Sequence, residues 1–211
     1  MSTFYNRIAG HSIERLAALS DGIFGVAMTL LVLDLTVPAR EAVHSEHGLW
    51  LALAALVPKL VTYLMSFITA GIFWIGQQTQ LNHLSRADRH LAWLHIAFLF
   101  FVSTLPFHTA LLSEFIQYRV ALIVYWANIF LLGLCLLATW EYAVRHGLVK
   151  DTAPAQIASA IRGRIYASQM IYFVGALLCV FSTYLSIAVF VLAQLNYAIA
   201  PSLGWFRSTK E

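Results

Sequence analysis

Three polar residues, Arg15, Ser20 and Asp21, open a long apolar stretch, RLAALSDGIFGVAMTLLVLDL at positions 15–35. The stretch has the length of a membrane-spanning helix, for which about 20 residues are needed. A carboxylate in or beside hydrocarbon is costly unless it finds a partner. Arg15, about a turn and a half before Asp21, or polar groups of neighbouring helices are candidate partners. The plain interpretation is a first helix packed in a bundle, with Asp21 simply paired at its entrance.

Beyond this cluster, one side of the expected helix carries a regular stripe of side chains. Its members recur at spacings of three and four residues, so they share one helical face. The first of them are small, which would allow another backbone to approach closely. The stripe consists of Ala18, Gly22, Val26, Thr29, Leu30 and Leu33.

Two later stretches add polar groups that are expected at the same membrane face as Asp21. Trp74 and Gln77 lie near the end of the second apolar run, and His95 lies early in the third. Buried polar groups in a membrane need one another as hydrogen-bond partners. The sequence therefore predicts a polar network of Arg15, Ser20, Asp21, Trp74, Gln77 and His95. In the alternative interpretation, Trp74 belongs to an interfacial aromatic belt, and Gln77 and His95 are hydrated.

Eight histidines raise the question of metal or haem binding. His44 and His47 flank Ser45-Glu46 in a polar loop without further ligands nearby, and His90 and His95 are five residues apart, a poor spacing for one helical face. Cys-x-x-Cys, His-Glu-x-x-His, phosphate-loop and nucleophile-elbow motifs are absent from the sequence. The two cysteines lie in apolar runs and are expected to be reduced. We therefore expect no bound metal, no cofactor and no enzymatic activity.

The composition is 60% hydrophobic and only 11% charged, against about a quarter charged in ordinary soluble domains. It predicts an all-α polytopic membrane protein whose first partner is the lipid bilayer. The modest positive charge indicates cytoplasmic loops rather than nucleic-acid binding. A length of 211 residues allows one domain of membrane spans, residues 1–211. A cleavable signal peptide is not expected, because the first apolar run is too long for a signal core.

Six transmembrane helices are predicted from the apolar runs and their boundaries. Pro38 is expected to end the first, Pro58 to kink the second, and Pro106 to bend the end of the third. Lys59 is expected to snorkel or to pair with a carboxylate such as Asp34. A polar stretch at 145–164 should separate the fourth helix from the last pair. The helices are expected at residues 13–37, 49–76, 88–110, 117–144, 164–182 and 184–200.

The distribution of lysine and arginine sets the expected orientation. Six spans place both termini on one side, and that side then carries Arg7, Arg15, Arg86, Arg89, Arg145, Lys150, Arg162, Arg164, Arg207 and Lys210. The other side receives only Arg40, Arg119 and Lys59. Because cytoplasmic loops are enriched in these residues, both termini are predicted in the cytoplasm.

Several motifs resemble those of the endolysosomal potassium channel family, transmembrane protein 175, and its prokaryotic relatives. Arg15-x-x-x-Leu19-Ser20-Asp21 is similar to the Arg-x-x-x-Phe-Ser-Asp signature of that family, and TLLVLDL follows as in its first helix. Phe73-Trp74-x-x-Gln77 resembles its Phe-Trp-x-x-His pattern, and LAWLHIAFLFFVSTLPF resembles its third helix. The likeness is specific over about the first half of the chain. Glutamine stands here for the family's histidine, and His95 for its usual asparagine, so a differently wired network is expected.

The resemblance implies six helices per subunit and a homotetramer, with the first helices lining a central pore. Aligned on Ser20-Asp21, the pore constriction falls at Val26, with Leu30 and Leu33 further out, on the stripe that spacing alone identifies. Thr29 falls at a position that the family links to potassium preference. A ring of aliphatic side chains can gate by dewetting and requires partial dehydration of the ion, which favours potassium modestly.

The sequence thus predicts a passive, potassium-preferring cation channel in the plasma membrane of a prokaryote. Potassium ions, the bilayer and three further copies of the chain are its expected partners. One alternative is a proton-coupled transporter or proton-permeable channel that uses Asp21 and His95, with Asp34 as a further relay group. Another is an intramembrane enzyme or cofactor protein that uses the histidines.

Overall fold

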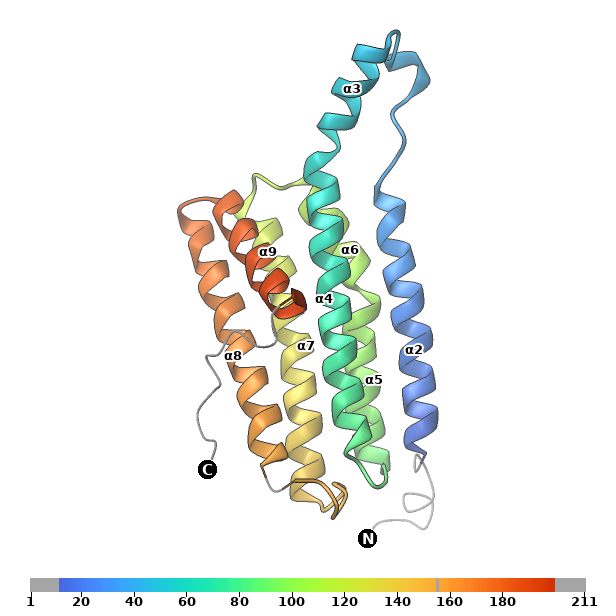
Figure 1. The fold of residues 1–211 in the computed structure, drawn as a ribbon, viewed down its shortest axis with the longest axis vertical. Helices are drawn as coiled ribbons and strands as arrows, with labels where there is room; N and C mark the ends of the chain where they lie inside the picture. Colours follow the sequence, from blue (N-terminus) through green and yellow to red (C-terminus); the bar gives the residue numbers. More distant parts are fainter. Residues whose placement is uncertain (1–11, 155, 200–211) are drawn as a thin grey trace.

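The computed structural model describes residues 12–154 and 156–199, and in these every regular element is a helix. Eight are α-helices that stand mostly side by side, and the short η segments are 3₁₀-helices (Figure 1). In chain order the elements are α2 (Ile13–Leu30), η1 (Leu31–Asp34), η2 (Arg40–Ala42), α3 (Glu46–Ala55), α4 (Val57–Asn82), α5 (Arg89–Ser103), α6 (Leu105–Glu114), α7 (Arg119–Arg145), α8 (Ile157–Leu177), η3 (Leu178–Val180) and α9 (Thr183–Ile199).

Among the described residues, five stretches are long and apolar enough to cross a membrane: Ile13–Asp34, Val57–Asn82, Arg89–Glu114, Arg119–Arg145 and Ile157–Val180. This confirms the all-α polytopic membrane class. The sixth predicted span corresponds to α9, a helix of 17 residues that is shorter than the other five. The count of six spans therefore stays a prediction.

Helix α2 is amphipathic in a way that its sequence explains. Its buried residues recur every three or four positions, as one face of a helix requires: Leu16, Ser20, Phe24 and Ala27. The hydroxyl of Ser12 caps the helix by accepting from the backbone N–H of Arg15. The regular helix ends earlier than the predicted residue 37, and continues as the tighter 3₁₀ segment η1.

The second predicted helix, 49–76, is two helices. α3 ends at Ala55, Leu56 is the junction, and α4 runs on to Asn82. Pro58 lies in the first turn of α4, where its missing N–H is not needed, so it starts a helix instead of kinking one. α3 stands beyond the end of the bundle (Figure 1), and none of its residues is buried.

The third predicted helix, 88–110, is divided in the same way. α5 ends at Ser103 and α6 begins at Leu105, with Pro106 in its first turn. α6 reaches Glu114, four residues beyond the predicted end. Together the two helices still form one apolar span, so the division by proline does not change the number of crossings.

Helix α7 has a buried face that includes Tyr125 and Trp140, both fully buried, whereas α9 packs on α4 and α8. α7 contacts α5 and α6 on one side and α8 on the other. α8 begins at Ile157, so residues 157–164 are helical and the expected polar connection is shorter than predicted. Cys135 and Cys179 are free thiols, in agreement with the sequence.

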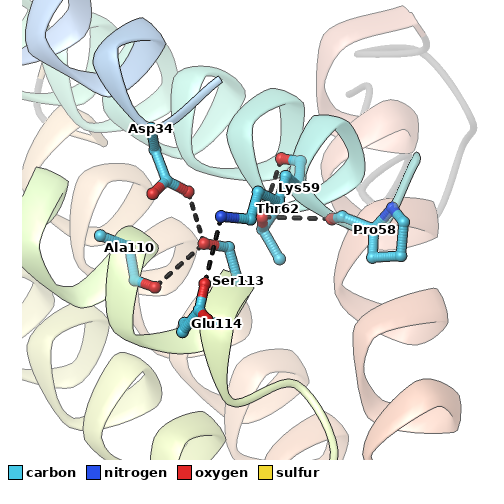
Figure 2. Close-up of polar contacts among 7 residues, drawn as sticks. All are labelled: Asp34, Pro58, Lys59, Thr62, Ala110, Ser113 and Glu114. Carbon is cyan, nitrogen blue, oxygen red and sulfur yellow. Dashed lines mark hydrogen bonds and ion pairs between the residues drawn. The ribbon is translucent and has the colours of Figure 1, made fainter. Parts of the chain in front are cut away.

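Lys59 pairs with Glu114 at an Nζ–Oε2 distance of 3.1 Å, and not with Asp34. Asp34 instead accepts a hydrogen bond from Ser113. Lys59 therefore pairs with a carboxylate, as predicted, but the carboxylate is Glu114 and not the example given, Asp34. Both groups nevertheless lie at the same end of the bundle, opposite the end where α2 begins (Figures 1 and 2).

Candidate ion path along helix α2

The stripe on α2 is exposed along its length in the single chain. Val26 retains 59% of its accessible surface and Leu33 retains 69%, although both are apolar. Leu30, between them, is also exposed. α2 lies at the edge of the bundle, packed on α4 and α5 through its other face (Figure 1). The face with Val26, Leu30 and Leu33 is thus free for a partner or an ion path.

Two glycines on this side leave room for close approach. A Cβ atom added at Gly22 or Gly25 would meet nothing within 4 Å in the single chain. Ala18, one turn before Gly22, is exposed as well. Small residues at such positions allow helix backbones to come close in a membrane.

Thr29 is exposed between Val26 and Leu30 on this face. Its hydroxyl contacts the carbonyl oxygens of Val26 at 2.8 Å and Gly25 at 3.0 Å and donates its proton to this part of its own helix. The hydroxyl oxygen keeps its lone pairs, so it can still accept a hydrogen bond or contact a cation. Met28, by contrast, is half-buried against the core of the subunit.

Ser20 is the centre of a buried polar cluster between α2, α4 and α5. Its hydroxyl lies 2.7 Å from Nε2 of His95 and accepts from Nε2 of Gln77 at 2.9 Å. The same hydroxyl contacts the carbonyl oxygen of Leu16 at 2.9 Å. That carbonyl oxygen in turn lies 3.3 Å from Nε2 of His95. Two oxygens thus face this ring nitrogen, an arrangement that suits a protonated Nε2. All three side chains are at most 2% exposed.

Aromatic rings separate this polar cluster from the middle of the bundle. Phe98 packs against His95, Phe24 and Phe73, with ring centroids 6.0–6.4 Å apart. Oε1 of Gln77 is buried and has no partner within the described part of the chain. In an apolar surrounding such a cluster holds helices together, because exposing any member to hydrocarbon is costly.

Asp21 belongs to a separate, exposed group. Oδ1 of Asp21 accepts from Nε1 of Trp74 at 2.8 Å and from Nε2 of Gln78 at 2.9 Å. Arg15 is exposed, and no ion pair joins it to Asp21 among residues 12–154 and 156–199. The six residues proposed as one network therefore fall into two groups with Arg15 outside both. Gln78 was missed, although it follows Trp74 by four residues and so shares its face of α4.

No three metal-ligating side chains of His, Cys, Asp or Glu gather anywhere in the described residues. His44 and His47 are both exposed, on the connection to α3 and at its start. His90 contacts the ring of Tyr142, whereas His95 bonds Ser20, so these two histidines serve different contacts.

Replacing Ser20 by alanine is expected to destabilise the subunit more than replacing Asp21 by asparagine. Ser20→Ala removes the buried acceptor of Gln77 and the nearer of the two oxygens that face Nε2 of His95, at a cost of about 1–3 kcal/mol. Asp21→Asn keeps the shape of an exposed acceptor whose partners can turn to water. The midpoint of thermal unfolding of the purified protein in mild detergent measures both. A larger drop in the unfolding midpoint for Asp21→Asn than for Ser20→Ala would contradict this expectation. It would mean that the exposed group around Asp21 stabilises the subunit more than the buried cluster around Ser20.

Comparison with known proteins gives a consistent picture. The family model described as "Endosomal/lysosomal potassium channel TMEM175" matches residues 15–106, which include both polar groups and the stripe. A protein of Streptomyces collinus named as a potassium channel is 36% identical over 155 residues, covering 70% of this chain and 74% of that protein. The mouse protein named endosomal/lysosomal proton channel TMEM175 is 29% identical over 207 residues, and the match covers 40% of its length.

A solved structure is also similar. The crystal structure of a lysosomal potassium-selective channel TMEM175 homologue from Chamaesiphon minutus superposes with a TM-score of 0.75 at 28% identity. The match covers 88% of this chain and 96% of that one. The structural similarity therefore extends over the later helices. In sequence, these helices resemble the family only in their number and their hydropathy.

Proposed function

The chain belongs to the TMEM175 family of ion channels, and on that premise we propose that it is a passive, potassium-preferring cation channel. The observation that carries the proposal is the exposed stripe of α2. The side chains of Val26, Leu30 and Leu33 are large, apolar and exposed. They lie on the side of α2 where Gly22 and Gly25 leave open space. As members of a channel family, the relatives conduct ions and are not enzymes, which sets aside the catalytic alternative.

We infer a homotetramer from the same face. One helix cannot enclose an ion path, whereas several copies of α2 around an axis can, and closed rings are the usual form of homo-oligomers. The resemblance of the motifs to prokaryotic family members gives the number four. In this arrangement the stripe faces the axis, and Met28 stays inside its own subunit, where it packs on the core.

The constriction is proposed at Val26, with Leu30 and Leu33 forming wider or flanking rings. A ring of valines has no oxygen with which to replace hydration water, so an ion must pass it partly dehydrated. Potassium is cheaper to dehydrate than sodium, which gives a modest preference. The hydroxyl of Thr29 lies beside Val26 on the helix and supports this preference by offering an oxygen next to the dry ring.

The proposed location is the plasma membrane of a prokaryote, with both termini in the cytoplasm. Arg86, Arg89, Arg145, Lys150, Arg162 and Arg164 gather at the end of the bundle where α2 begins. Arg40, Lys59 and Arg119 belong to the other end. This asymmetry supports the orientation, since cytoplasmic ends are enriched in basic residues.

Flux through purified protein in liposomes tests the proposal. Vesicles loaded with potassium and diluted into sodium should take up protons through an added protonophore as potassium leaves, and a pH-sensitive dye records this uptake. Valinomycin added last shows that all vesicles are loaded and intact. Flux no greater than in protein-free vesicles, with a normal valinomycin response, would refute the channel.

Proton permeation is a second candidate function. It is favoured by Asp21, which lies exposed near the start of α2 and is bonded by Trp74 and Gln78 within the described part of the chain. The mouse relative, moreover, carries the name of a proton channel. His95 is a poorer candidate relay, because it is enclosed between helices on the other face of α2. Acidification of the same vesicles without protonophore would show proton flux directly.

A further inference from the structure

The end of the proposed pore helix changes its geometry. After Leu30 the α-helix tightens into the 3₁₀ segment η1, Leu31–Asp34. In a 3₁₀-helix residues three apart lie above one another, whereas in an α-helix they are offset by about 60°. Leu33 is thereby stacked over Leu30 on the exposed face. Leu31, which is only 1% exposed, and Asp34 share another face, about 120° away.

Asp34 is tied to α6 through a buried hydroxyl. Ser113 donates to Oδ2 of Asp34 and also contacts the carbonyl oxygen of Ala110 at 2.9 Å (Figure 2). Ser113 itself is only 5% exposed. The bond joins residues 79 positions apart and links the end of the pore helix directly to the bundle.

The ion pair beside it is a weaker constraint. Lys59 and Glu114 approach to 3.1 Å, but 62% of the Glu114 side chain is exposed. Such a pair contributes little, because solvent screens it. Lys59 Nζ points between Ser113 and Glu114, and Thr62 bonds backbone carbonyls of its own helix (Figure 2). Within the cluster, the contact that holds η1 is therefore the one between Asp34 and Ser113.

We propose that Asp34 and Ser113 are positioning residues of the ion path, which keep the last turn of the pore helix in its 3₁₀ form. This inference rests on the proposed function, because it assumes that the exposed face of α2 lines the path. Without the bond the turn relaxes towards an α-helix. Leu33 then rotates by about 60° away from Leu30, and Asp34 turns towards the path.

Labelling of a cysteine at position 33 tests the rotation. Cys135→Ser and Cys179→Ser first remove the native thiols, and Leu33→Cys then provides a single target. A cationic methanethiosulfonate reagent is added to the protein in lipid nanodiscs, so that both faces are reached. Ser113→Ala is expected to slow labelling by up to about fivefold, because one lost hydrogen bond shifts the equilibrium between the two helix forms by about that factor.

The control variants distinguish a rotation of residue 33 from a loss of folding or assembly. Ser113→Thr keeps the hydroxyl and should restore fast labelling, and Glu114→Gln removes only the exposed ion pair and should leave the rate unchanged. If Ser113→Ala does not assemble, Asp34→Ala is measured in its place, with the same slowing expected, because alanine has no oxygen to accept from Ser113. Labelling at the parental rate in the variant that assembles would overturn the proposal. Absent potassium flux in the unmutated protein would instead refute the channel itself.

Discussion

Replacing Val26 by tryptophan is expected to abolish potassium flux while leaving the subunit folded. Val26 projects from α2 with 59% of its surface exposed, so a larger side chain can extend away from its own subunit. Around a fourfold axis, however, four indole rings would fill the space that four valines leave open. The expected loss is at least about a hundredfold, corresponding to a barrier of roughly 3 kcal/mol. Flux from liposomes measures the effect.

The matched control is Leu192→Trp on α9. Leu192 is a large apolar residue with similar exposure, 66%, but lies on a different helix. It should fold equally well and conduct normally. Normal flux in Val26→Trp, or equal loss in both variants, would show that the exposed face of α2 does not line the path.

Replacing Gly22 by leucine is expected to break assembly without unfolding the chain. No atom lies within 4 Å of the position that its Cβ would occupy, so the single subunit accepts the larger residue. Where copies of α2 approach closely, the same side chain would collide with a neighbouring backbone. We expect the association constant of the tetramer to fall at least about tenfold, which corresponds to about 1.4 kcal/mol, and the tetramer fraction to fall with it.

Native mass measurement in mild detergent reports the tetramer fraction. Gly163→Leu is the matched control, because Gly163 on α8 also has no atom within 4 Å of its Cβ position. It should remain tetrameric. A monomeric unmutated protein that still conducts, or a Gly22→Leu variant that stays fully tetrameric, would contradict the proposed assembly.

The stripe on α2 was predictable because it depends only on helical periodicity. Spacings of three and four placed Ala18, Gly22, Val26, Leu30 and Leu33 on one face, and the structure leaves that face exposed. Its tightening into a 3₁₀-helix after Leu30 was not predictable. That change depends on Ser113 of α6, which lies far away in the sequence.

The two prolines show a limit of local rules. Pro58 and Pro106 each lie within a continuous apolar run, and a kink was the natural prediction for such positions. Both instead occupy the first turn of a new helix, at junctions formed by Leu56 and Thr104. The sequence alone does not distinguish a kinked helix from two consecutive ones, because proline suits both.

The partners of Asp21 illustrate what only packing decides. The sequence identified the need for a partner and left two kinds of candidate, Arg15 on the same helix and polar groups of neighbouring helices. In the structure, α4 provides Trp74 and Gln78 on the side where Asp21 emerges. Ser20, one position earlier, turns inwards to Gln77 and His95. Neighbouring residues on a helix point about 100° apart, so adjacent polar residues readily serve different groups.

The reversal potential with potassium on one side and sodium on the other tests the central claim most directly. The unmutated channel should reverse towards the potassium equilibrium potential. Val26→Asn should move the reversal potential towards zero, because an amide ring is wetter and no longer demands dehydration. Met28→Ala, inside the subunit, should leave it unchanged. An unchanged reversal potential in Val26→Asn together with a shifted one in Met28→Ala would mean that the ion path lies along a different face of the helix.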